Sequence, residues 1–154
     1  MSRFADALDR DVSEIKRPPP LPAGSYIFSV PKMPDPAEPI EGKPYERLNI
    51  LVRVVQPLDD VDPEALAAFG SVAGTVSNLS YLFSTDEAEA TRFEQTLNRL
   101  KMFLGHCGID TERGSLKQAL AQLPGTQFIG TVSHRLDNRD NETVYAEITR
   151  TTSA

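Results

Sequence analysis

Arginine and tyrosine side chains alternate with apolar ones in one stretch of the chain, and this spacing is its clearest indication of chemistry. In YERLNILVRVVQ, residues 45–56, Tyr45, Arg47 and Arg53 fall on one face of a strand, and Lys43 lies just before it. Proteins that bind single-stranded nucleic acid combine cations that pair with phosphates and aromatic rings on which bases stack. The strand therefore predicts a binding face, although an ordinary sheet with arginine and tyrosine on its solvent side has the same pattern.

Residues of the same types lie on the other predicted strands. Tyr81 and Phe83 share one face of a third strand, and Tyr145 lies opposite the apolar side of the last one. The complete candidate set for DNA binding is Lys43, Tyr45, Arg47, Arg53, Tyr81, Phe83, His134, Arg135 and Tyr145. The cations of this set would contact phosphates, and its tyrosines would stack on bases.

Catalytic and metal-binding patterns are sparse. Cys107 as nucleophile and His134 as base would be the minimal catalytic pair, and no third group orients either one. Cys107 also continues the apolar stripe of a predicted helix, which favours a core thiol. His106, Cys107 and His134 do not have the number or spacing of zinc ligands, and FGSVAGT lacks the Lys-Ser/Thr ending of a phosphate loop. We predict a protein that is not an enzyme and that uses no cofactor and no metal.

The totals fit a globular domain. The chain has 154 residues, of which 40% are hydrophobic and 25% charged, with one cysteine and no apolar run that could span a membrane. The first 17 residues lack the apolar segment of a secretory signal, so we expect a cytoplasmic location. The net charge of −6 weighs against nucleic-acid binding, but a basic groove can exist on an acidic protein.

Periodicity and turn residues predict eight regular elements within one domain, residues 21–154. The strands are expected at 25–30, 45–56, 75–84, 126–135 and 142–150, and the helices at 62–70, 84–108 and 115–125. The predicted helix caps are Asp62 with Pro63 and Gly70, Ser84 with Glu87, and Ser115 with Gln118. The main helix carries an apolar stripe of Phe93, Leu97, Leu100, Leu104 and Cys107. Residues 31–44 contain five prolines, so we expect a loop without strand or helix.

Five strands with a helix between the third and the fourth is the element order of an OB-fold. We therefore predict an α+β, mainly β fold, a five-stranded OB-like Greek-key barrel with a main helix and two short extra helices. Other α+β sandwiches share this order. Tyr26 and Phe28 of the first strand are expected in its core.

Residues 1–20 are expected to form an N-terminal arm. Ser2 is a candidate N-cap, and the proline-rich spacer RPPP at 17–20 would end any helix. The apolar positions of the arm follow a helical spacing and are Phe4, Leu8, Val12 and Ile15. This stripe either packs on its own domain or meets a partner or a second copy of the chain, as in a homo-oligomer.

Several stretches, among them LPAGSYIFSV, GKPYERLNILVRVVQ, RLKMFLGHCGI and LPGTQFIGTVSHR, resemble a family of small phage proteins that is similar to phage single-stranded DNA-binding proteins. The resemblance covers residues 21–150 and implies an OB-like fold, no enzymatic activity, and cooperation with phage replication or recombination proteins in the host cytoplasm. The chain ends in TRTTSA without an acidic tail, so the N-terminal arm becomes the candidate for recruiting partners. The alternative is a phage protein-interaction module, such as an adaptor, an anti-host factor or a virion component.

Overall fold

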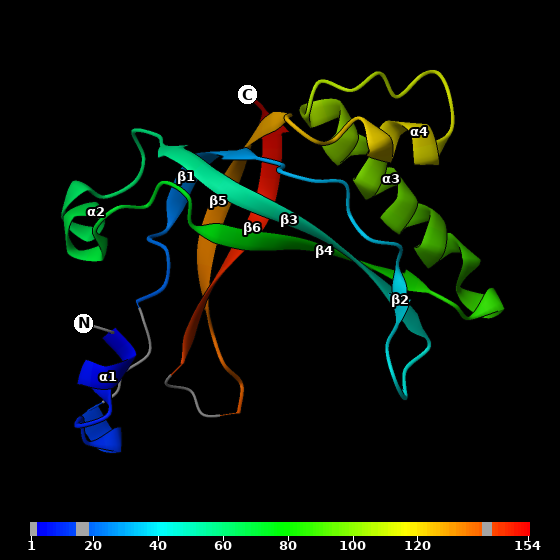
Figure 1. The fold of residues 1–154 in the computed structure, drawn as a ribbon. Helices are drawn as coiled ribbons and strands as arrows, with labels where there is room; N and C mark the ends of the chain where they lie inside the picture. Colours follow the sequence, from blue (N-terminus) through cyan, green and yellow to red (C-terminus); the bar gives the residue numbers. More distant parts are fainter. Residues whose placement is uncertain (1–2, 15–18, 140–142) are drawn as a thin grey trace.

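A six-stranded antiparallel sheet and one long helix form most of the computed structural model, which describes residues 3–14, 19–139 and 143–154 (Figure 1). The strands are β1 Gly24–Ser29, β2 Glu38–Pro39, β3 Tyr45–Pro57, β4 Val76–Ser84, β5 Gln127–Leu136 and β6 Val144–Ser153. The helices are α1 Arg3–Ala7, α2 Pro63–Phe69, α3 Ala90–His106 and α4 Leu116–Ala121, with 3-10 turns η1 Val12–Glu14 and η2 Glu87–Glu89. The predicted α+β, mainly β class is confirmed.

β1 is the central strand that joins the two halves of the sheet. It pairs with β3 on one side and with β5 on the other, while β6 pairs with β5, and β2 and β4 both pair with β3. Within the described residues, no hydrogen-bonded ladder joins β4 to β6. The sheet is therefore open, and it does not close into the predicted five-stranded barrel.

Aromatic side chains form the centre of the core. Tyr26 and Phe28 of β1 are fully buried, which confirms their predicted place. The Phe28 ring stacks on Phe128 of β5 at 5.4 Å between centroids, and Phe103 of α3 meets Phe128 edge-on at 4.9 Å. Gly130 lies beside these rings, because a Cβ atom there would be 2.8 Å from the Phe28 side chain. This packing holds α3 against the inner face of the sheet.

The proline-rich connection between β1 and β3 contains a short strand that the prediction of a loop missed. Glu38 and Pro39 of β2 pair with Arg47 and Glu46 of β3. β2 is an outer strand, with β3 as its one partner among the described elements. Proline is tolerated at such an edge because its missing N–H faces away from the ladder.

Local capping signals position the two short helices correctly. Asp62 caps α2 by accepting a hydrogen bond from the Glu64 amide, and Pro63 occupies its first turn. Ser115 and Gln118 form the predicted reciprocal capping box of α4. Both devices need only residues that are neighbours in the sequence.

The beginning of the main helix differs from the prediction. Ser84 is the last residue of β4 and is buried, and its hydroxyl accepts a hydrogen bond from the Asp86 amide. Asp86 caps the 3-10 turn η2 through the Ala88 amide, and α3 follows from Ala90. The predicted Ser84 capping box is wrong because the strand continues through that residue.

The buried stripe of α3 also differs in part. Leu100, Leu104 and Cys107 are buried as predicted, but Phe93 remains 37% exposed at the edge of the contact. Thr96 and Phe103 are buried and were not part of the predicted stripe. The Thr96 hydroxyl donates to backbone carbonyl oxygens, which satisfies it inside the core.

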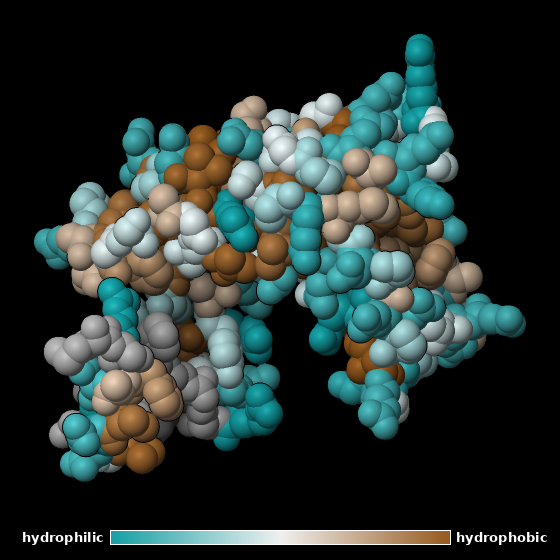
Figure 2. Space-filling model, in the orientation of Figure 1, coloured by the Kyte–Doolittle hydropathy of each residue, from teal (hydrophilic) through white to brown (hydrophobic). Residues whose placement is uncertain are grey.

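The N-terminal arm does not bury its apolar stripe. Phe4, Leu8 and Val12 are 74%, 67% and 84% exposed. Figure 2 shows hydrophobic surface over α1, at the lower left. Four parts of the prediction lie outside the described residues. They are the N-cap Ser2, the stripe position Ile15, the first half of the RPPP spacer, and residues 140–142 at the end of the polar turn of the last hairpin. No helix in the described ranges is long and apolar enough to cross a membrane.

Candidate nucleic-acid interface

The outer face of β3 carries the cations that the alternation predicts. Leu48, Ile50 and Val52 point into the core, so Arg47 and Arg53 point outward and are exposed. This follows from the two-residue period of a strand, in which successive side chains lie on opposite faces. Lys43 is exposed in the turn that precedes β3.

The neighbouring strand β4 extends this surface, which we call the β3–β4 outer face. It consists of Arg47, Asn49, Leu51 and Arg53 of β3 and of their cross-strand partners Leu82, Ser80, Asn78 and Val76 of β4. The Ser80 hydroxyl donates to the Asn49 side-chain oxygen at 2.6 Å, which fixes both side chains in the middle of the face. Val76 and Leu82 are 50% and 41% exposed, so the face has both apolar and cationic groups.

Arg47 and Arg53 form no ion pair and no side-chain hydrogen bond within the described part of the chain. Their charges are therefore available to a ligand. Arg47 also lines a hollow of about 320 Å³ beside β2, and Asp35 and Glu38 line the same hollow. These two carboxylates weaken the local positive potential at Arg47, whereas the residues paired with Arg53, Ser29 and Val76, are uncharged.

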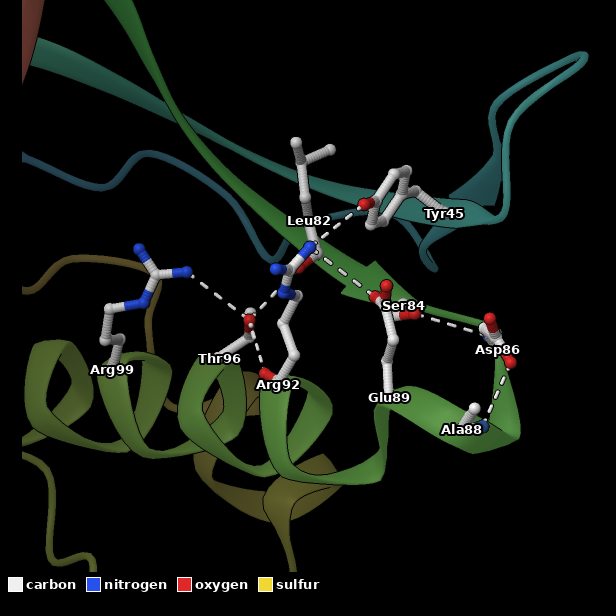
Figure 3. A network of polar contacts seen from close by, with 9 residues as sticks. All are labelled: Tyr45, Leu82, Ser84, Asp86, Ala88, Glu89, Arg92, Thr96 and Arg99. Carbon is white, nitrogen blue, oxygen red and sulfur yellow. Dashed lines mark hydrogen bonds and ion pairs between the residues drawn. The ribbon is translucent and has the colours of Figure 1, made fainter.

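Tyr45 is held at one end of this face by the first turn of α3. Its hydroxyl accepts a hydrogen bond from the Arg92 guanidinium at 3.3 Å, and Arg92 also pairs with Glu89 at 3.5 Å (Figure 3). The ring of Tyr45 is half-buried. Part of its surface therefore remains accessible to a base.

Tyr81 and Phe83 of the candidate set lie on the inner side of β4 and are buried, which corrects the prediction that Tyr81 offers an open ring for stacking on bases. Tyr81 packs against Phe103 at 6.3 Å and Phe83 against Phe93 at 5.6 Å between ring centroids. Burial raises the pKa of Tyr81 to about 12, and the nearby positive charge of Arg99 opposes that rise. Alternation established that the two rings share a face, but it did not establish that this face is the core.

His134, Arg135 and Tyr145 lie on the β5–β6 hairpin, away from the β3–β4 outer face (Figure 1). Arg135 sits over the Tyr145 ring at 5.7 Å and pairs with Glu147 at 3.2 Å, while the Tyr145 hydroxyl donates to Asp137. The His134 Nε2–H donates to the Leu21 carbonyl oxygen at 2.8 Å. These groups thus have internal partners, and the ladder places β1 between their hairpin and β3.

A second concave surface lies where β4 and β6 approach each other without pairing. We call it the seam cavity. It measures about 280 Å³, and its polar lining consists of Ser80, Tyr81, Arg99, His106, Thr149, Arg150 and Thr151. The sequence places Arg150 beside Tyr145 on the last strand, but the candidate set includes neither Arg150 nor Arg99. No local pattern relates the two, because α3 and β6 are distant in the sequence.

The described residues contain no group of three or more His, Cys, Asp or Glu side chains that could hold a metal ion. Cys107 is buried, and burial raises its pKa to about 11. A thiol with a raised pKa is a poor nucleophile near neutral pH, so its placement fits a core residue. No model of a known protein family matches the chain, and no curated protein matches it.

Proposed function

We propose that the protein binds single-stranded DNA without catalysing a reaction, on the β3–β4 outer face. The observation that carries this proposal is the pair of exposed arginines, Arg47 and Arg53, which have no partner among the described residues and lie on a face that also presents apolar side chains. Unpaired guanidinium groups bind phosphates, and apolar and aromatic side chains contact bases.

We further propose that the sheet is an OB-like barrel opened at one seam. Its support is the strand order, with β1 between β3 and β5, β4 outside β3, β6 outside β5, and α3 between β4 and β5. In OB-folds the second and third strands and the loops after the first and fourth strands bind oligonucleotides. Those connections correspond here to the segment with β2 and to the β5–β6 connection, in which residues 137–139 and 143 are described. With the phage resemblance, this suggests a role in phage replication or recombination in the host cytoplasm.

Titration of a fluorescent oligo-dT of about 30 nucleotides at several salt concentrations tests the proposal. We expect binding that weakens steeply with salt and that duplex DNA does not displace. The double variant Arg47→Gln with Arg53→Gln should lower the slope of log K against log salt by about 1.4, because about 0.7 is lost for each phosphate contact on a single strand.

The control is Arg113→Gln with Lys117→Gln, which removes the same charge from exposed positions at and before α4. Equal slopes for the two double variants would show that Arg47 and Arg53 do not contact the DNA. Absence of any oligo-dT binding at low salt would refute the function itself.

A protein-interaction module is the second candidate, and one observation favours it. The apolar stripe of Phe4, Leu8 and Val12 is exposed rather than packed on its own domain. Exposed apolar side chains that are close together in the sequence favour contact with another protein surface. A second copy of the chain is the simplest partner.

A further inference from the structure

The seam cavity is lined by positive charges, although the protein as a whole is acidic. The chain has a net charge of −6, yet no residue that lines this cavity in the described structure is Asp or Glu. Arg99 of α3 and Arg150 of β6 both line it. Two cations around one concave surface without a compensating carboxylate create a positive potential that attracts an anion.

The hydrogen bonds of these side chains leave donors available. Within the described chain, the Arg99 guanidinium donates once, from Nη2 to the Thr96 hydroxyl, and Arg150 makes no side-chain hydrogen bond or ion pair. A guanidinium group has five N–H donors in a planar fork that matches phosphate geometry. At least two N–H groups of each arginine therefore remain for a ligand.

The cavity is also held in place by the surrounding structure. His106 Nδ1 and the Thr151 hydroxyl lie 2.9 Å apart, which links the end of α3 to β6. On the β4 side, Ser80 lines the cavity and donates to Asn49 of the β3–β4 outer face. The cavity and the outer face are therefore adjacent, and a strand that crosses the face from Asn49 to Ser80 arrives at the seam.

The cavity has an apolar part as well. Leu79, Met102 and Ile148 line it beside the polar groups. Such a lining suits a ligand with a charged group at one end and an apolar or aromatic body, and a nucleotide has this chemistry.

We propose that the seam cavity binds a phosphate group of a nucleotide, with Arg99 and Arg150 holding the same phosphate. The proposal rests on the proposed function, since the phosphate is expected to belong to a single strand that also crosses the β3–β4 outer face. The same chemistry would accept a free 5′-mononucleotide, and the experiment separates the two sources.

The test uses the double variant Arg99→Gln and Arg150→Gln, which we call the seam variant. The double variant Arg113→Gln and Lys117→Gln is again the control. Oligo-dT affinity should fall about tenfold in the seam variant, as expected for the loss of charged hydrogen bonds. Its salt slope should fall by about 0.7, because the two arginines share one phosphate. In NMR titrations of the wild type, thymidine 5′-monophosphate should shift the amide signals of Ser80 and Thr151, while thymidine should not.

Each outcome decides between the proposals. If oligo-dT binds and the seam variant behaves like the control, the seam inference is overturned and the proposed function stands. If oligo-dT does not bind but the mononucleotide shifts these amides in the wild type and not in the seam variant, the inference holds for free nucleotides and the proposed function fails. If thymidine shifts the amides as strongly as its monophosphate, or if neither probe nor oligo-dT binds, the inference is overturned.

Discussion

Tyr26 places a hydroxyl group inside the aromatic core, and its hydrogen bond explains how the core tolerates it. The hydroxyl donates to the carbonyl oxygen of Pro22 at 2.6 Å, and both residues are buried. Burial raises the pKa of Tyr26 to about 12, and the carboxylate of Asp60 adds to the rise. The protonated form is therefore the form that the fold stabilises.

Replacing Tyr26 with Phe should lower the free energy of unfolding at pH 7 by about 1–3 kcal/mol, because the buried Pro22 carbonyl loses its donor. The stabilisation linked to the raised pKa is complete below the unfolded pKa of about 10 and is lost as the pH rises toward the folded value. The difference between wild type and Tyr26→Phe should therefore narrow between pH 8 and pH 11. Urea denaturation at both pH values measures it, and a difference that stays constant would contradict this assignment.

For single residues, the sequence predicts which side chains of a strand share a face better than it predicts which of the two faces is buried. Arg47 and Arg53 could be placed on the outside because Leu48, Ile50 and Val52, which alternate with the outward positions on β3, are apolar. Tyr81 and Phe83 alternate with Ser80 and Leu82, so neither face of β4 is clearly the polar one. The packing of α3 against β4 decides which rings are buried, and that contact is not local in the sequence.

At the scale of elements, helix boundaries could be predicted where they depend on neighbouring residues and could not where they depend on distant contacts. The beginnings of α2 and α4 could be predicted because Asp62 and Ser115 bond to amides two or three residues away. The beginning of α3 could not, since it depends on how far β4 continues along β3. The strands could be predicted from the sequence. The missing ladder between β4 and β6 in the described structure could not, because it depends on contacts between segments that are distant in the sequence.

Because β1 and β5 pack closely at Gly130, a larger side chain at this position should destabilise the protein. In Gly130→Ala the new Cβ would lie 2.8 Å from the Phe28 ring and 3.2 Å from the Phe128 ring, and both rings are fully buried. The rings cannot move aside without disturbing the core, so we expect a loss of about 1–3 kcal/mol in the free energy of unfolding. Chemical denaturation measures this loss.

Gly105→Ala is the matched control within α3. A Cβ atom there meets nothing within 4 Å, so the gain in helix propensity should stabilise the protein by about 0.5–1 kcal/mol. Equal stability of Gly130→Ala and wild type would mean that the two phenylalanine rings pack less tightly against β5 than described.

At the scale of the whole molecule, the exposed arm predicts self-association. Deletion of residues 1–20 should convert a larger assembly into a monomer and should leave the affinity for a short oligo-dT unchanged, because the β3–β4 outer face is not part of the arm. Light scattering gives the mass, and anisotropy gives the affinity. Phe4→Ser, Leu8→Ser and Val12→Ser in the full chain should have the same effect without removing the arm.

If the full chain is already a monomer, or if the assembly survives both changes, the stripe does not join copies of the chain. Loss of oligo-dT affinity in the deletion would instead assign the arm to DNA binding.

The central position of β1 also has a consequence for the order of folding. Ser25 of β1 and Thr131 of β5 are hydrogen-bonded across 106 positions of sequence, whereas β3 and β4 are close neighbours along the chain. Pairings between distant segments form slowly, because a long loop must close before the contact is gained. During synthesis, β3 and β4 can pair early, but Tyr26 and Phe28 have no cover from Phe128 until β5 leaves the ribosome. A growing chain that has completed α3 but not β5 is therefore the stage at which its aromatic surface is most open to misassembly.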